Sequence, residues 1–403
     1  MTTPVPSSSE LRATSGARHW PEFHRRVIRG QAKGQVLWQP RISAWWKDKR
    51  FFGKPLPEPY EHLSVSNMFR YMDCSARLYE FNRCFQRIGH PRVHVSEEDL
   101  GNNQALTRIR TPKGEQTAVK EMRPTCRLPL HVKREIVTQE DLLVATWRAE
   151  NAHYIFDREL YETILDEWGD LGLPTMYLPR MNIQDLYINT MGTEPAIFAM
   201  HDWGVEQFRP YFDALDNLHD RLIDLLNSLP QFEIVNFGDN VHAGTLPPRW
   251  FEEFVLPVYI RRCDRLHAAG KFVHAHWDGD VRSLLPYVRH TGLDGIEAIT
   301  PQPQGDVTLE EIKEALGDSL FLIDGIPAVY FDATYSVEVL QNSVRQIIRL
   351  FAPNLILGIS DEVSSTADIE RIRLVGDVVD EYNASLEDLV ETMSPVDRGS
   401  TCG

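Results

Sequence analysis

The second half of this chain alternates short apolar runs with stretches of helical spacing, and this alternation constrains the fold more than any other feature. The runs begin at residues 232, 272, 295, 320 and 355, and each gap is long enough for a helix. Continuous apolar strands joined by helices are typical of a parallel sheet covered on both faces. No GxGxxG or P-loop motif follows any run, which disfavours a doubly wound nucleotide-binding sheet.

The first half is less regular but compatible with the same architecture. Further parallel strands are expected at residues 36–42, 175–178 and 196–201. Residues 106–122 form a pattern typical of an antiparallel hairpin that turns at 112–114. About eight parallel strands therefore fall in one unit, which predicts a (β/α)8 TIM barrel with an N-terminal extension and a small antiparallel hairpin insertion.

The two ends of the chain differ from this pattern. Residues 1–17 and 394–403 have the composition of disordered tails, so we expect a single barrel domain over residues 18–393. The first segment has no apolar stretch of the kind that a signal peptide needs.

Charge and cysteine content limit the partners and the compartment. The formal net charge of −16 argues against nucleic-acid binding, although residues 1–50 alone carry ten basic and three acidic side chains. We interpret that basic segment as a solvated face, or alternatively as a contact for an acidic partner or a second subunit. Five cysteines without a CxxC pair, and no apolar run of 18 residues, predict a cytoplasmic protein that does not enter a membrane.

Polar side chains gather at the ends of the predicted strands, where the loops of a barrel converge on one mouth. The polar residues that end or follow the five late runs are Asn236, Asp239, Asn240, His242, His274, His276, Asp278, Asp280, Glu297, Asp324, Ser360, Asp361 and Glu362. So many polar groups in one concavity are costly to bury without a ligand. We predict catalytic roles for Asp239, His276, Glu297 and Glu362, and substrate contacts for Asn240, His242 and Asp324. For Asp324, a turn-capping role is equally compatible with the sequence.

His274 and His276 lie two residues apart on one predicted strand, so both imidazoles point into the barrel. Two such imidazoles and a carboxylate from another strand would suit a first-row metal, and we predict a zinc site of His274, His276 and Glu362. The alternative is a hydrogen-bonded pair that positions a polar substrate.

Aromatic and basic residues near the predicted mouth are candidates for holding the substrate. Large aromatic side chains in a barrel more often pack in the core. The candidates for substrate contact are Trp277, which directly follows His276 on the same predicted strand, and Trp38, which lies in the first predicted strand. We predict that both contact the substrate, together with Arg41.

Three segments of the second half resemble the uroporphyrinogen decarboxylase superfamily. They are FGDNVHAGTLPPRWFEEFVLPVYIRRCDRLHAAGKFVHAHWDGD, GLDGIEAITPQPQGDVTLEEIKEALGD and LILGISDEV. The resemblance runs continuously over about residues 232–382 and implies a TIM barrel with its site at the C-terminal mouth. The superfamily includes tetrapyrrole decarboxylases, and methyltransferases that move a methyl group between a small compound and a corrinoid protein or thiol.

The resemblance gives the two branches different site residues. The decarboxylases bind their polycarboxylate substrate with an R-x-x-x-R pair after the first strand, and here Arg41 is followed by Trp45 at the second position. The methyltransferases bind zinc through a His-x-Cys strand end and a later Cys. His274 matches that histidine, His276 replaces the first Cys, and the later position offers only Asp361 and Glu362. Such a nitrogen and oxygen ligand set is a harder Lewis acid than a thiolate site.

We therefore expect an enzyme of the methyltransferase branch. It would remove a methyl group from a small O- or N-methylated compound, such as an aromatic methyl ether, and pass it to a separate corrinoid protein, since no cobalamin-binding motif is present. Metal-free catalysis by a general acid stays open, and by analogy with the superfamily we expect a homodimer. The alternatives are a carboxy-lyase acting on a small aromatic acid, anchored by Arg41 and Arg180, and a binding protein without catalysis.

Overall fold

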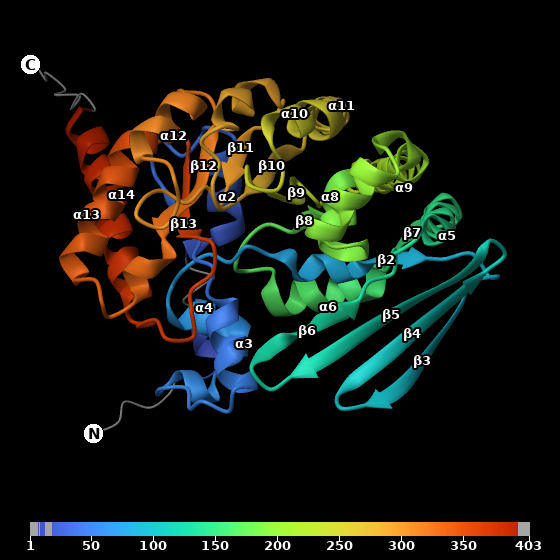
Figure 1. Cartoon of the computed structure of the whole chain (residues 1–403). Helices are drawn as coiled ribbons and strands as arrows, with labels where there is room; N and C mark the ends of the chain where they lie inside the picture. Colours follow the sequence, from blue (N-terminus) through green and yellow to red (C-terminus); the bar gives the residue numbers. More distant parts are fainter. Residues whose placement is uncertain (1–6, 8, 13–17, 394–403) are drawn as a thin grey trace, which may run out of the picture.

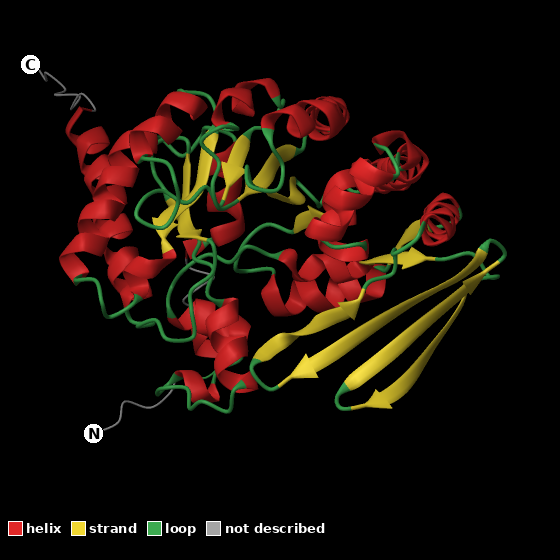
Figure 2. Cartoon of the chain, viewed as in Figure 1, coloured by secondary structure: helices red, strands yellow, loops and turns green. Residues whose placement is uncertain are grey.

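The computed structural model of the chain describes residue 7, residues 9–12 and residues 18–393. The other residues of the predicted tails, 1–17 and 394–403, lie outside the described residues, so their disorder stays a prediction. In the described part, seven parallel strands form one curled sheet in the order β1-β13-β12-β11-β10-β9-β8. Helices surround this sheet (Figures 1 and 2), which confirms the predicted TIM-barrel class.

The barrel strands coincide with the predicted apolar runs because their residues are buried on both faces. Their bounds are β1 Leu37–Trp38, β8 Thr175–Leu178, β9 Ile234–Val241, β10 Phe272–Trp277, β11 Gly295–Glu297, β12 Phe321–Pro327 and β13 Leu355–Ser360. The register pairs His276 with Glu297 on the neighbouring strand. The polar ends of β10 and β11 therefore lie side by side.

A short irregular segment, rather than a regular strand, occupies the gap between β1 and β8. The Ser75 N–H donates to the carbonyl of Trp38 at 3.1 Å, on the β1 side. On the other side, Leu78 forms a parallel bridge with Pro174, and its carbonyl accepts from the Thr175 N–H at 3.3 Å. Residues 75–78 thus connect the two edges of the sheet and close the barrel.

Five of the helices outside the barrel, α4, α5, α6, α12 and α13, begin at side-chain caps. Thr308 and Glu311 form a capping box at the start of α12, and the Ser336 side chain accepts from the Val339 N–H at the start of α13. The helices are α2 Trp20–Ile28, α3 Ser43–Phe51, α4 Val65–Tyr71, α5 Gln139–Glu150, α6 Arg158–Trp168, α7 Asn182–Asp185, α8 Thr193–Asp202, α9 Arg209–Asn227, α10 Pro248–Trp250, α11 Leu256–His267, α12 Leu309–Leu316, α13 Val337–Phe351 and α14 Arg371–Met393. Shorter turns are η1 Tyr60–His62, η2 Tyr79–Cys84, η3 Leu186–Thr190, η4 Val205–Gln207, η5 Phe251–Val255, η6 Leu285–His290 and η7 Ala328–Phe331.

An antiparallel sheet projects from the barrel at the lower right of Figure 1. Its strands, in order, are β3 His94–Gly101, β4 Gln104–Thr111, β5 Gly114–Arg123 and β6 Cys126–Lys133. A separate pair joins β2 Phe85–Ile88 to β7 His153–Phe156. The predicted hairpin over 106–122 is confirmed as β4 and β5, and the insertion is larger than predicted.

Two predicted elements have a different form. Residues 196–201, predicted as a strand, belong to the helix α8, where Ala196, Ala199 and Met200 are buried at helical spacing and Phe198 is exposed. A short apolar run does not distinguish a strand from a helix by itself. The helix predicted over 248–269 is interrupted by the π-helical turn η5, just before Pro257, which has no N–H to continue the helical ladder.

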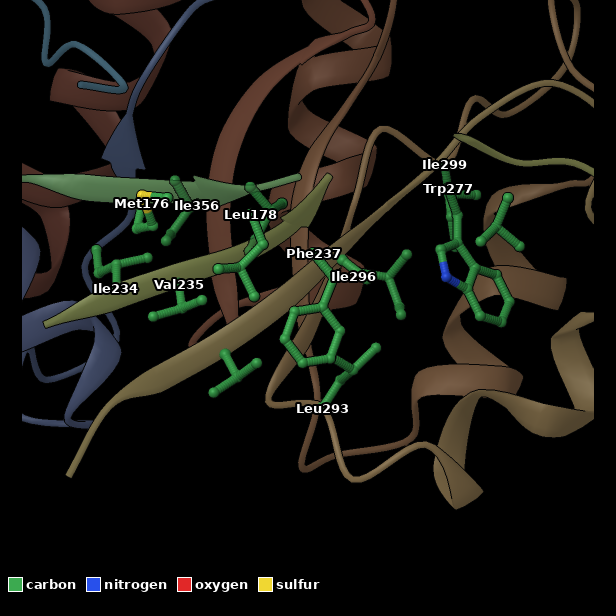
Figure 3. Packing of buried hydrophobic residues seen from close by; sticks show 14 of the residues in the cluster. Met176, Leu178, Ile234, Val235, Phe237, Trp277, Leu293, Ile296, Ile299 and Ile356 are labelled. Carbon is green, nitrogen blue, oxygen red and sulfur yellow. The ribbon is translucent and has the colours of Figure 1, made fainter. Parts of the chain in front are cut away.

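The apolar core lies between the barrel strands and the helices around them. Figure 3 shows Met176 and Leu178 of β8 close to Ile234, Val235 and Phe237 of β9. Of the helices in the described residues, none has the length and apolar character needed to cross a membrane.

Candidate active site

The carboxylate of Glu297, at the end of β11, is the centre of a buried polar cluster inside the barrel. Glu297 is fully buried. Its oxygens lie 2.8 Å from a guanidinium nitrogen of Arg77 and 2.7 Å from the hydroxyl of Tyr79, and the amide of Asn236 also donates to it. Three segments distant in the sequence therefore meet at one carboxylate.

Both histidines of β10 point to the same carboxylate, as strand alternation predicts. The Nδ1 atom of His274 lies 3.3 Å from one oxygen of Glu297, and Nδ1 of His276 lies 3.4 Å from the other. The Nε2 atom of His276 lies 3.9 Å from the carboxylate of Asp278. Because Glu297 holds Nδ1 of His276, Nε2 is the atom of this ring that can serve a substrate.

Two arginines add positive charge to the cluster, and each is neutralised. Arg77 forms a two-pronged pair with Asp324, at 2.7 and 3.2 Å, besides its contact with Glu297. Arg41 lies 3.3 Å from Glu297 and also contacts the two carboxylates that follow β13, Asp361 at 3.0 Å and Glu362 at 3.4 Å. Of the two arginines that the sequence suggested, Arg41 lies in the cluster and Arg180 contacts Asn240 instead. The second arginine of the cluster is Arg77, and the two guanidinium groups face four carboxylates.

Burial and charge fix the protonation of the central groups. Burial alone would raise the pKa of Glu297, but Arg77 and the two histidines outweigh it and hold that pKa well below the usual range of a glutamate. Burial lowers the pKa of His274, so this ring is neutral near pH 7. Burial raises the pKa of Asp324 despite its pairing with Arg77.

The backbone beside the cluster is strained. Asp324 has a φ of 83° in the buried strand β12, and Ala298, directly after Glu297, has a φ of 69°. Left-handed backbone is unfavourable for both residue types and concentrates at functional sites. On β13, a Cβ atom at Gly358 would collide with the carboxylate of Asp324, so the absence of a side chain there makes room for the Arg77–Asp324 pair.

Residues 209–382 match the family model of uroporphyrinogen decarboxylase. This segment, somewhat less than half of the chain, is therefore similar to the uroporphyrinogen decarboxylase family. The matched residues include β9 to β13, which supply the histidines, Glu297 and Asp324. No curated protein matches the sequence.

Three solved structures show different degrees of similarity to this chain. A methyltransferase from Methanosarcina mazei superposes with a TM-score of 0.52 at 10% identity, covering 89% of this chain and 97% of that chain. A GH18 chitinase of Flavobacterium johnsoniae has a TM-score of 0.35 at 11% identity, and the superposition covers 57% of this chain and 82% of the chitinase chain. A type I 3-dehydroquinate dehydratase from Clostridium difficile has a TM-score of 0.32 at 11% identity, and the superposition covers 57% of this chain and 75% of the dehydratase chain. The first of these supports a shared barrel architecture.

The R-x-x-x-R motif of the superfamily's decarboxylases is replaced by a different arrangement. Trp45, at the second position of the motif, is buried and donates its ring N–H to the carbonyl of Ala367 at 3.2 Å. The second arginine of the cluster is Arg77, 36 positions after Arg41, in the segment that closes the barrel. Arg77 and Tyr79 were not predicted, because no apolar run marks this segment.

Of the predicted site residues, His274, His276, Glu297, Arg41, Asp324 and Glu362 meet in the cluster, and others lie elsewhere. Asp239 accepts from the Met181 N–H and the Tyr259 hydroxyl, each at 3.1 Å, and so connects β9 to neighbouring segments. Asn240 accepts from Arg180 at 3.1 Å. His242 accepts from the Gly244 N–H at its Nδ1 atom. These contacts hold the loops around the mouth.

The two predicted substrate-binding tryptophans are core residues in the structure. Trp277 lies among the buried core residues of Figure 3 and is fully buried. Its ring packs edge-on against that of Phe251, with centroids 5.3 Å apart. Because His274 and His276 point inward, alternation directs Trp277 outward. Trp38 lies beside Gly376 of α14, whereas its neighbour Gln39 accepts from Arg77 inside the barrel. The structure therefore gives no support to substrate contacts by either tryptophan.

The geometry does not fit the predicted zinc site of His274, His276 and Glu362. Among the described residues, the three potential ligand side chains that come within 4.8 Å of one another are the exposed Glu58, Glu61 and His62. Glu362 is instead held by Arg41 and by the Ala44 N–H at 3.2 Å. Two guanidinium groups beside Glu297 would also repel a divalent cation. We therefore derive no chemical step through a metal.

Protonation of Asp239 leads to a first testable prediction. Burial raises its pKa from 3.8 to about 6, so the stability that this carboxyl provides is present below pH 4 and is lost as the pH rises to about 6. Replacing Asp239 with Asn removes the titration. Between pH 4 and pH 7, we expect the free energy of unfolding of Asp239→Asn to rise by roughly 2–3 kcal/mol relative to that of the wild type. Urea unfolding across this range measures the difference, and parallel curves for the two proteins would contradict it.

Proposed function

We propose that the protein is a methyltransferase that moves the methyl group of a small O- or N-methylated compound to a separate corrinoid protein. The observation that carries the proposal is the buried His276–Glu297 pair at the mouth of the barrel. The family and the barrel shared with a methyltransferase support it further. The compound, the corrinoid partner and the homodimer are parts of this proposal.

The pair can supply the proton that an ether oxygen needs when its methyl group leaves. As the C–O bond breaks, the methyl carbon bonds to the reduced cobalt of the partner's corrinoid, and both electrons of the broken bond stay on the oxygen. The oxygen takes the proton from Nε2 of His276. Glu297, held ionised by Arg77, balances the positive charge of the protonated ring and fixes its tautomer.

The charges of the cluster disfavour a polycarboxylate substrate. Arg41 and Arg77 face Glu297, Asp324, Asp361 and Glu362, so neither guanidinium is left for the several carboxylates of a porphyrinogen. A small uncharged donor avoids this repulsion.

A methyl-transfer assay tests the proposal. Purified protein is incubated with reduced corrinoid protein and a panel of methyl ethers and methylamines, and methylcobalamin is followed by its absorbance. We expect one class of donor to give methylcobalamin in proportion to enzyme. Absence of the product with every donor would refute the function.

One observation favours a second candidate, a carboxy-lyase for a small aromatic acid. The second buried arginine, Arg77, helps to bind Glu297 and Asp324, so Arg41 could exchange the half-exposed Asp361 for one substrate carboxylate. His276 would then protonate the carbanion left by carbon dioxide. Release of carbon dioxide without any corrinoid distinguishes this reaction from methyl transfer.

A further inference from the structure

We propose that the last turn of α3 and the residues after it form a docking surface for an acidic partner protein. Lys47, Lys49, Arg50, Phe51, Phe52 and Lys54 make up this α3 surface. The proposal that this partner is the methyl-accepting corrinoid protein rests on the proposed function; the acidic chemistry of the partner does not.

The cations of the α3 surface form no close ion pair within the described residues, although the charge of Lys47 acts on the nearby Glu80. Three of its four cations lie over rings: Lys49 over Trp45 at 5.1 Å, Arg50 over Trp46 at 4.8 Å and Lys54 over Phe52 at 5.6 Å. Burial and the neighbouring charge of Lys54 lower the pKa of Lys49, so the cations repel one another. Because these positive charges lie close together, the surface attracts anionic groups.

The nearby acidic side chains are engaged elsewhere. Asp48 is the one acid in residues 43–54, and Arg127 of β6 binds it at 2.7 Å. Glu58 contacts His62 at 3.1 Å, and Glu61 accepts from Arg50 at 2.8 Å through its backbone carbonyl, not through its carboxylate. In a chain with a net charge of −16, the α3 surface is therefore a local positive exception.

Exposed apolar groups at the same place favour a protein contact. Phe51 and Phe52 are 39% and 38% exposed, and their rings meet edge to face with centroids 5.1 Å apart. Aromatic residues and arginine beside apolar area are the composition that protein interfaces favour.

The α3 surface lies within reach of the barrel mouth. The helix begins two residues after Arg41, and the N–H of Ala44 in its first turn donates to Glu362. At 1.5 Å per residue, Phe51 is about 12 Å along the helix from Ser43. A protein that covers the mouth would therefore contact these side chains, which is the geometry that methyl transfer to a protein-bound corrinoid needs.

Charge reversal tests the docking surface through the choice of methyl acceptor. The variant Arg50→Glu/Lys54→Glu is compared with Arg345→Glu/Arg349→Glu, which makes the same charge change at exposed sites on α13. With corrinoid protein as acceptor, we expect the α3 variant to raise KM at least about tenfold at low salt with little change in kcat. With free cob(I)alamin, both variants should match the wild type. An unchanged KM for the corrinoid protein would overturn the proposal.

A binding measurement tests whether the α3 surface binds an acidic partner, even if no methyl transfer occurs. Poly-L-glutamate and phosphatidylserine vesicles are titrated into the full chain at low salt. We expect binding of poly-L-glutamate that Arg50→Glu/Lys54→Glu weakens at least about fivefold and the α13 variant leaves intact, with a smaller loss for Phe51→Ser/Phe52→Ser. Equal binding by the α3 variant, or binding to vesicles alone, would overturn an acidic protein as the partner. Absence of methyl transfer to either acceptor would instead refute the proposed function.

Discussion

Replacing Glu297 with Gln is expected to reduce methyl transfer by about 10²–10⁴-fold, the range that general acid catalysis typically contributes. Glutamine keeps the shape of the side chain but not the charge. The protonated ring of His276 then loses its counter-ion, and Arg77 retains Asp324 as its one close carboxylate. Single-turnover rates with saturating donor and corrinoid protein measure the effect.

Stability must be separated from catalysis in this variant, because removing one partner of a buried ion pair commonly costs about 3–5 kcal/mol. Glu233→Gln is a matched control. Glu233 is also held by two arginines, Arg25 at 2.7 Å and Arg29 at 2.8 Å, but it lies just before β9, at the opposite end of the strand from the mouth. We expect this control to lose stability without losing activity. A folded Glu297→Gln protein with the wild-type rate would exclude Glu297 from catalysis.

The sequence predicts the centre of the site but not the residues that complete it. Continuous apolar runs locate β9 to β13, and alternation places His274 and His276 on the inner face, where the register brings His276 beside Glu297. Each of these inferences needs only local periodicity and the order of strands.

Arg77 and Tyr79 depend on a tertiary contact that periodicity does not encode. Their segment closes the barrel through a few hydrogen bonds, on Trp38 and Thr175, and has no strand-like run of its own. Trp277 shows the opposite case. The alternation that places the histidines inside also directs this tryptophan outward, so its burial follows from the sequence once that rule is applied to every residue of the strand.

Catalysis by Asp239 and the predicted zinc site stay predictions, and the partners of these side chains in the structure do not favour them. A carboxylate or imidazole near a strand end is equally compatible with metal binding, with catalysis or with holding a loop, and its partners decide among these roles. Met181 and Tyr259 engage Asp239, while Arg41 engages Glu362. These partners come from parts of the chain whose proximity is visible only in three dimensions.

The second large effect is expected at His24, whose replacement by leucine should remove one buried source of the protein's acid sensitivity. His24 lies in α2 and is buried, and neither ring nitrogen has a hydrogen-bond partner among the residues that the structure describes. Burial, together with the charges of Arg77, His274 and Arg25, lowers its pKa to about 3. Below about pH 6.5 the unfolded chain therefore binds a proton at this histidine, whereas the folded chain does not. As the pH falls from 6.5 towards 3, this difference lowers the free energy of unfolding by roughly 5 kcal/mol in total.

Leucine has a similar size and no group to protonate, so the free energy of unfolding of His24→Leu should depend less on pH in this range. Between pH 7 and pH 4.5 we expect its free energy of unfolding, measured by urea denaturation, to gain roughly 2–3 kcal/mol relative to the wild type. His201→Leu is the control, because the His201 side chain is 86% exposed and its replacement should leave the pH profile unchanged. The same acid dependence in His24→Leu and the wild type would show that His24 accepts a proton in the folded protein. In that case its ring has a partner, such as a buried water molecule, and the positive charges of Arg77 and His274 are screened from it.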